Sequence, residues 1–218
     1  TSALGASYAA WDNQYNLRLW GYQFNNYGTL LYADNNIKFQ PTKSLSFSLA
    51  AQAGTDNQLN NTNNALTNDN LGQISSNFIG VQGIINYDWF SLNLGYNNVW
   101  GPSSAYGGGA IVTPYTYVFA TDPLYTTPYM SGLADLGTAG TAYKISPTLT
   151  FINGNLSLAP AYTIFNTALV EWNGTQEYDF VASYNVPQVK GLTLFGVYAY
   201  QQVPDVNSNG STYITQLY

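Results

Sequence analysis

Two carboxylates in the last quarter of the chain have the spacing that an acid–base pair would need. Glu177 and Asp179 are separated by one residue, so on a β-strand their side chains point to the same face. Paired carboxylates can divide the roles of general acid and general base, as they do in glycoside hydrolysis. A solvated polar wall explains the pair more simply, and this is the interpretation that we favour over catalysis.

Composition excludes most other catalytic chemistry. The chain has no His and no Cys, which excludes Ser-His-Asp catalysis, imidazole proton transfer, disulfides and histidine or thiolate metal sites. The glycine run 107–109 lacks the Lys and Ser/Thr of a phosphate-binding loop. A net charge of −6 with only five Lys and Arg residues excludes the basic patch that nucleic-acid binding requires. We therefore predict no enzyme activity, no cofactor, no metal and no nucleic-acid partner.

The overall composition is unusual for a soluble domain. Of 218 residues, 45% are hydrophobic and 16% aromatic but only 7% are charged, so the usual charged surface is missing. No run of about 18 apolar residues is present, which argues against a transmembrane helix. No linker divides the chain, and residues 1–218 are expected to form a single domain.

The elements that must position the polar side chains are β-strands with one apolar and one polar face. In residues 45–53, Leu, Phe and Ala alternate with Ser and Gln, and the same alternation recurs along the chain. It predicts about eleven antiparallel strands of nearly membrane-spanning length. The predicted strands are 4–11, 15–24, 28–39, 45–53, 79–89, 90–97, 143–151, 156–165, 178–186, 192–201 and 211–218. The segment 192–201 is apolar on both faces, which leaves its orientation open.

The lengths of the connections favour a transmembrane β-barrel of the bacterial outer membrane. Short links alternate with longer ones along the chain, as periplasmic turns alternate with outer loops in such barrels. A soluble β-sandwich, the alternative fold, has no reason to sort its loops by length. Closed bacterial barrels usually have an even number of strands. We therefore expect at least one further strand on the N-terminal side of this chain.

Charged residues on the polar strand faces are predicted to line the pore. A Lys or Arg on the lipid face near the membrane midplane would cost roughly 2–4 kcal/mol, which favours the inner face. The predicted pore-lining residues are Arg18, Asp34, Lys38, Lys144, Glu177 and Asp179. Lys43 and Lys190 lie beside turns, where the penalty is small, and are expected near lipid headgroups.

The longest connection, residues 101–141, is predicted to be folded. Its four prolines and many aromatic residues argue against disorder. Such a loop could form an external cap or could fold inward as a constriction of the pore, and we favour the constriction. The candidate constriction residues are Tyr115, Tyr117, Asp122, Tyr125 and Tyr129.

Three passages carry a resemblance to a known family. They are YNLRLWGYQFNNYGTLLYADNNIKF at 15–39, PYMSGLADLGTAGTAYKI at 128–145 and EYDFVASYNVPQVKGLTLFGVYAY at 177–200. These passages resemble the porin D (OprD-type) family of substrate-selective outer-membrane channels. The resemblance implies an 18-stranded barrel surrounded by lipid and lipopolysaccharide and commonly packed as a homotrimer, with this chain as its C-terminal portion. The implied function is passive diffusion of small hydrophilic solutes or ions.

The sequence departs from this family in the charges of the predicted inner wall. Family members often carry a ladder of basic residues that guides carboxylates, whereas only Arg18, Lys38 and Lys144 fall on polar strand faces here. The alternative function is a structural or adhesive surface protein, in which the same strands form a sandwich or a filament subunit. The two hypotheses differ in whether the apolar strand faces meet lipid or a protein core.

Overall fold

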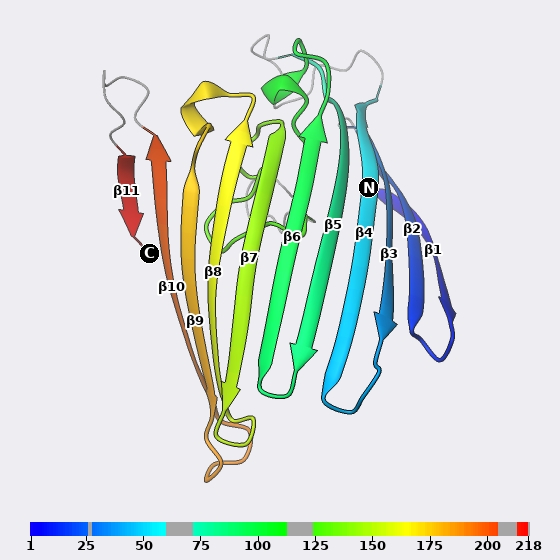
Figure 1. The fold of residues 1–218 in the computed structure, drawn as a ribbon. Coiled ribbons are helices and arrows are strands. Elements are labelled where there is room, and N and C mark those ends of the chain that lie inside the picture. The colour runs from blue at the N-terminus through cyan, green and yellow to red at the C-terminus, as the bar shows by residue number, and fades with distance from the viewer. Residues whose placement is uncertain (26–27, 60–71, 113–123, 205–212, 218) are drawn as a thin grey trace.

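Eleven strands form one antiparallel sheet, which curves like part of a barrel wall (Figure 1). The computed structural model describes residues 1–25, 28–59, 72–112, 124–204 and 213–217. The strands are β1 (Ser2–Ala10), β2 (Tyr15–Phe24), β3 (Gly28–Phe39), β4 (Leu45–Gln58), β5 (Ser75–Tyr87), β6 (Phe90–Trp100), β7 (Gly140–Phe151), β8 (Leu156–Thr167), β9 (Gln176–Asn185), β10 (Thr193–Pro204) and β11 (Tyr213–Leu217). Each strand pairs only with its neighbours in the chain, from β1 to β11. The predicted all-β, antiparallel fold with about eleven strands is confirmed.

The alternation of residue types decides which side chains point to which face of the sheet. In β4, Leu49 and Ala53 are exposed, whereas Gln52 and Asp56 are buried. In β9, Tyr178 is exposed while its neighbour Glu177 is buried. The buried polar residues share the face against which the connection between β6 and β7 packs. We call this the inner face, and the opposite, apolar one the outer face.

Connections at the two ends of the sheet differ in length. The short turns between β1 and β2, β3 and β4, β5 and β6, β7 and β8, and β9 and β10 all lie at one end (Figure 1). Several contain Asp, Asn or Gly at positive φ, including Asp12, Asp88, Asn153 and Gly154, because these residues tolerate the left-handed region that tight turns need. The other connections lie at the opposite end and are longer, as the sequence predicts, except for the short link between β2 and β3.

A compact hydrophobic core lies on the inner face, towards the end with the long connections. The sheet contributes Phe24, Leu30, Phe78, Val99, Ala142 and Phe165, and the β6–β7 connection contributes Ile111, Leu124, Leu133 and Ala134. This connection includes the short 3₁₀ helix η1 (Tyr106–Gly108) at the end of the sheet, and a later part of it passes behind the sheet in the view of Figure 1. A second short 3₁₀ helix, η2 (Val170–Trp172), lies between β8 and β9. Among the described residues, no helix is long and apolar enough to cross a membrane.

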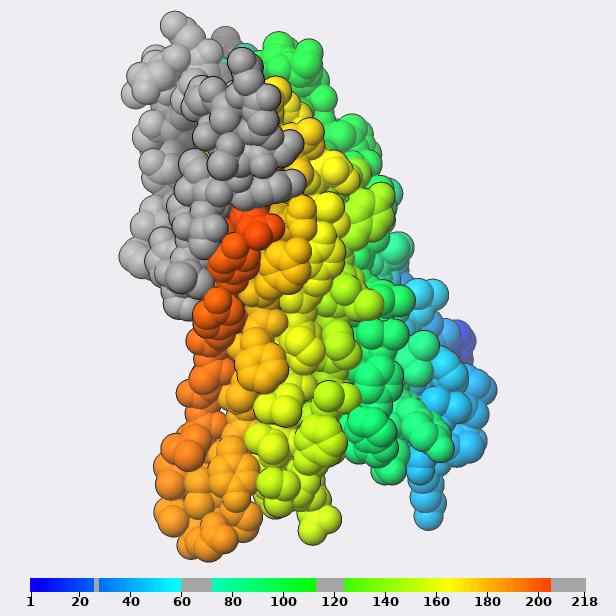
Figure 2. Space-filling view, turned by 60° about the vertical axis from the view of Figure 1, so that its left-hand side comes forward, coloured from blue at the N-terminus to red at the C-terminus, as the bar shows by residue number. Residues whose placement is uncertain are grey.

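Aromatic residues on the outer face form two bands. Near the short turns, Trp89 stacks on Phe151 with ring centroids 6.0 Å apart. Towards the other end, tyrosines of β6 to β10 make a row of ring contacts, with centroid distances of 5.1, 5.0 and 6.1 Å. The row consists of the pair Tyr96 and Tyr143, and of Tyr162, Tyr178 and Tyr200. Figure 2 shows the outer face of β6 to β10 as a continuous surface.

Register resolves the strand whose orientation the sequence left open. Tyr200 of β10 pairs with Tyr178 of β9, so the even-numbered residues of β10 share the outer face. Ala199 and Gln201 are therefore on the inner face, where both are buried. Several strands also extend past their predicted limits at the end with the long connections. The clearest case is β4, which continues to Gln58 rather than ending at Ala53.

Candidate functional site

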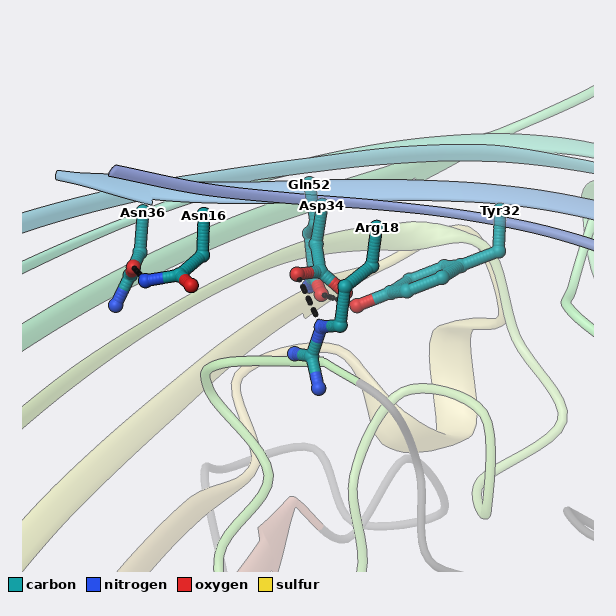
Figure 3. A network of polar contacts seen from close by, with 6 residues as sticks. All are labelled: Asn16, Arg18, Tyr32, Asp34, Asn36 and Gln52. Atoms are coloured by element: carbon teal, nitrogen blue, oxygen red, sulfur yellow. Dashed lines mark hydrogen bonds and ion pairs between the residues drawn. The ribbon is translucent and has the colours of Figure 1, made fainter. Parts of the chain in front are cut away.

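The inner face of β2 and β3 carries an ion pair. Arg18 and Asp34 are directly opposite each other in the register, and Arg18 Nε donates a hydrogen bond to Asp34 Oδ1 over 2.8 Å. The Asp34 side chain is largely buried, whereas 61% of the Arg18 side chain is exposed. Figure 3 shows the two terminal guanidinium nitrogens pointing away from the sheet, towards the β6–β7 connection. The pair thus places a nearly neutral but strongly polar group on the inner wall.

Amide side chains surround this ion pair. Asn16 Nδ2 donates to Asn36 Oδ1 over 3.2 Å, one step closer to the short turns. On the other side, the Tyr32 hydroxyl donates to Gln52 Oε1 over 3.1 Å. All six side chains in Figure 3 project from the same face of three neighbouring strands. This part of the wall is therefore built mainly from neutral hydrogen-bonding groups.

A cavity of about 430 Å³ lies between this polar wall and the β6–β7 connection. Tyr125 closes it from the side of the connection, and strands β1 to β5 supply the remaining walls. Its polar lining includes Ser7, Asn16, Arg18, Asp34, Asn36 and Gln82. Arg18 and Asp34, predicted to line the pore, and Tyr125, predicted in the constriction, line this one cavity.

The acidic pair of β9 lies beneath the connection and does not face the cavity. Glu177 is 0% exposed, and its Oε1 accepts a hydrogen bond from the backbone N–H of Met130 over 2.6 Å. Its other oxygen, Oε2, accepts from Gln201 Nε2 over 2.9 Å. Asp179 is 4% exposed and accepts from the backbone N–H of Tyr129 over 3.4 Å. The two carboxylates thus hold the connection against the wall.

Neighbouring strands add further contacts to the same stretch of the connection. Lys144 Nζ of β7 donates to the carbonyl oxygen of Thr127 over 2.6 Å, and Gln201 of β10 donates to Ser131 Oγ over 2.8 Å. Register places Lys144, Glu177 and Gln201 in one row across the inner face of β7, β9 and β10, with Thr163 of β8 between the first two. This row forms a docking strip for residues 127–131.

Two further anchors were not predicted from the sequence. Asp56 of β4 is 0% exposed, and its Oδ2 accepts from the backbone N–H of Val112 over 2.8 Å. Asn97 Oδ1 of β6 accepts from both the backbone N–H and the hydroxyl of Thr126, each over 3.1 Å. Asp56 continues the inner-face register of Gln52, so following the alternation past Ala53 would have revealed it.

The other predicted residues lie in different surroundings. Lys38 shares the inner face of β3 with Asp34 but is exposed near the short turns. Tyr129 is 56% exposed and lines a second space of about 600 Å³ beside β10, together with Met130, Trp172 and Gln201. Tyr115, Tyr117 and Asp122 lie outside the described residues.

One carboxylate within the connection is perturbed by its surroundings. Asp135 Oδ2 accepts from the backbone N–H of Gly132 over 2.8 Å, which closes a local turn. Burial raises the pKa of Asp135 above its ordinary value of 3.8, and the hydrogen bond from Gly132 opposes this shift only in part. In the described ranges, no group of three or more His, Cys, Asp or Glu residues could hold a metal ion.

Comparisons with known proteins give similarity in structure but not in sequence. No protein-family model matches the chain, and no curated protein sequence is significantly similar to it. Among solved structures, OprD of Pseudomonas aeruginosa aligns with a TM-score of 0.68 at 15% identity, over 99% of this chain and 58% of its own. A BenF-like porin of Pseudomonas fluorescens Pf-5 aligns with a TM-score of 0.69 at 14% identity, over 99% of this chain and 53% of the porin chain. OccK9 (OpdG) of Pseudomonas aeruginosa aligns with a TM-score of 0.71 at 14% identity, over 98% of this chain and 51% of the OccK9 chain.

These likenesses show the fold. Nearly the whole chain aligns with channels of the OprD type, so the chain has the fold of an OprD-type porin wall, as the resemblance of its strand pairs implies. The strands make one open sheet, not the two packed sheets of the alternative sandwich. The chain spans just over half the length of the porins that it matches.

Proposed function

We propose that the chain forms the wall of a passive outer-membrane channel that passes small hydrophilic solutes or ions. The observation that carries the proposal is the cavity on the inner face, where an ion pair and amide side chains face a docked loop across about 430 Å³. Water-filled pores are lined by polar groups and narrowed by inserted segments. Closure of such a pore requires partners for the free edges of β1 and β11, the terminal strands of the described sheet.

The outer face supports a location in a lipid bilayer. Large apolar residues are exposed there on nearly every strand, including Leu49, Val81, Leu94 and Ile145. Between the two aromatic bands, the eight residue steps from Tyr143 to Phe151 span roughly 27 Å along the strand. After the usual strand tilt, this length is comparable with the apolar band of about 25 Å in outer-membrane barrels. We propose membrane lipid and lipopolysaccharide as the surroundings of this face, and a homotrimer as the assembly.

The docked connection supports a role for residues 124–139 in narrowing the pore. Side chains from β6, β7, β9 and β10 hold this stretch against the inner face. The same contacts argue against catalysis, because Glu177 and Asp179 accept hydrogen bonds from backbone N–H groups and are shielded from the cavity. We therefore propose a channel and not an enzyme.

Reconstitution of the full-length protein into a planar lipid bilayer tests this proposal. The expected result is stepwise, ohmic ion conductance in KCl. A structural or adhesive surface protein would give no steps under the same conditions, and that outcome would refute the channel. Cross-linking of the protein in outer-membrane vesicles, followed by electrophoresis, tests the homotrimer.

A further inference from the structure

An aromatic stack on the inner face of β2 lies next to the polar cavity. Trp20 and Tyr22 follow Arg18 at every second residue, so all three side chains project from the inner face. The Trp20 and Tyr22 rings stack with centroids 5.9 Å apart and planes inclined by 21°. Tyr22 stacks in turn on Phe24, which belongs to the buried core. The stack is thus anchored at its buried end, and Trp20 is its free end, with 39% exposure.

Gly5 of β1 allows the Trp20 indole to lie flat against the wall. Gly5 and Trp20 are opposite each other in the register, and a Cβ atom at Gly5 would collide with the six-membered ring of the indole. The ring therefore covers the backbone of β1, and a broad aromatic surface lies parallel to the wall. Such a surface can bind the flat apolar face of a solute, because the face of an aromatic ring is electrically negative and attracts C–H groups.

Hydrogen-bonding groups accompany this surface at a suitable distance. Arg18 lies one inner-face step from Trp20, roughly 7 Å along the strand. Its terminal nitrogens point towards the connection, and Asn16 and Asn36 continue the polar surface beyond it (Figure 3). Asn16 Nδ2 donates to Asn36 Oδ1 and to the carbonyl oxygen of Asn13, which leaves Asn16 Oδ1 as an acceptor and Asn36 Nδ2 as a donor for a solute.

Charge on this part of the wall is nearly balanced. Two of the inner-face charges form the ion pair, and four others, Asp56, Lys144, Glu177 and Asp179, bind the connection. The surface that a solute meets is therefore made mostly of amides, hydroxyls and one indole ring. An uncharged sugar ring combines an apolar face of C–H groups with hydroxyls around its rim, and it matches both parts of this surface.

We propose that the inner wall of β1 to β3 binds uncharged pyranose sugars, with the sugar ring on Trp20 and its hydroxyls on Arg18, Asn16 and Asn36. The inference rests on the proposed channel function and names the class of solute that this channel prefers. Binding here would make sugar passage saturable, in contrast to simple diffusion through a featureless pore.

Block of the ion current by sugars tests the proposal. In single-channel recordings in KCl, maltose should reduce the current of the wild-type protein with a saturable dependence on concentration. In Trp20→Ala the half-blocking concentration should rise about fivefold or more, whereas Trp20→Phe should restore most of the block. Trp100→Ala is the matched control, because Trp100 is exposed to a similar extent, 42%, but lies on the outer face.

Two comparison solutes test whether the site binds the sugar ring and whether it prefers an uncharged sugar. Sorbitol has hydroxyls but no ring, and a block by sorbitol equal to that by maltose would overturn the proposed ring stacking. Glucuronate adds a carboxylate to a sugar ring, and a stronger block by glucuronate than by glucose would overturn the preference for uncharged sugars. Normal conductance without any saturable sugar block would refute the sugar site alone. A complete absence of conductance would refute the channel itself.

Discussion

The backbone N–H of Met130 and the carboxylate of Glu177 are joined by a hydrogen bond of 2.6 Å, although they are 47 positions apart in the chain. This contact couples the longest described connection to the ninth strand. The second carboxylate oxygen accepts from Gln201, so both oxygens of Glu177 are acceptors. A side chain that sequence analysis assigns to the pore wall is thus a structural anchor for the segment that covers the wall.

Replacement of Glu177 by Gln should loosen the connection. An amide presents an NH₂ group to one of two donors, which leaves a buried donor unpaired at a cost of about 1–3 kcal/mol. The fraction of molecules in which the connection has left the wall should rise roughly tenfold or more. Single-channel currents should therefore become larger and noisier. Glu171→Gln, at an exposed carboxylate in η2, is the matched control. Unchanged current noise in the Glu177 variant would contradict the anchoring role.

The ion pair of Arg18 and Asp34 should set the charge preference of the pore. Asp34→Asn leaves the guanidinium unbalanced and should lower the cation-to-anion permeability ratio about twofold, while Arg18→Gln should raise it by a similar factor. The double variant should return close to the wild-type ratio, because both charges are then absent. Reversal potentials in a KCl gradient measure the ratio, and Lys43→Gln beside a short turn serves as the control. A double variant whose permeability ratio differs from the wild-type ratio in either direction would contradict a neutralised pair.

The two faces of β4 should respond differently to a new charge. Leu49 is exposed on the outer face, whereas the adjacent Ala50 lines the cavity. Leu49→Lys should destabilise the membrane-inserted protein by roughly 2–4 kcal/mol near the midplane, and Ala50→Lys should cost far less because its ammonium group meets water. Urea titration of the protein in lipid vesicles measures the difference. Equal destabilisation by the two variants would refute the assignment of the faces.

Asp135 should make its local turn sensitive to pH. Burial raises the pKa of the folded carboxyl above 3.8, so the protonated form favours the docked turn. The stabilisation is complete below the ordinary pKa and is lost as pH rises through the raised value. Hydrogen exchange of the Leu136 and Gly137 amides, corrected for the intrinsic rate at each pH, should show lower protection at neutral pH than near pH 4. Asp135→Asn should remove this dependence, and its persistence in that variant would exclude Asp135 as the cause.

Sequence reasoning predicted the wall well because its signal is local. The limits of β2 and β3 match the predicted ranges 15–24 and 28–39, since alternation and turn residues both mark them. β4 was predicted too short because the polar residues 55–58 resemble a loop. In the structure they extend the strand beyond the apolar outer band, and Asp56 lies there, buried by the connection.

The docking of the connection was beyond the same reasoning. Alternation places Glu177 and Asp179 on the inner face but does not tell whether water or a folded segment covers them. Their partners are backbone N–H groups, which every residue except proline carries, so no side-chain pattern in residues 127–131 marks the contact. The pairing of Asp56 with Val112 escapes prediction for the same reason.

The chain-order pairing of the strands has a consequence for how the protein folds. Every described ladder joins neighbours in sequence, so the wall can form by successive closure of local hairpins, each with a small entropic cost. The hydrogen bonds of the connection instead join residues 47, 56 and 70 positions apart, to a surface that exists only after the strands have paired. The pore would therefore be wide when the wall first closes, and it would narrow as the last step of folding.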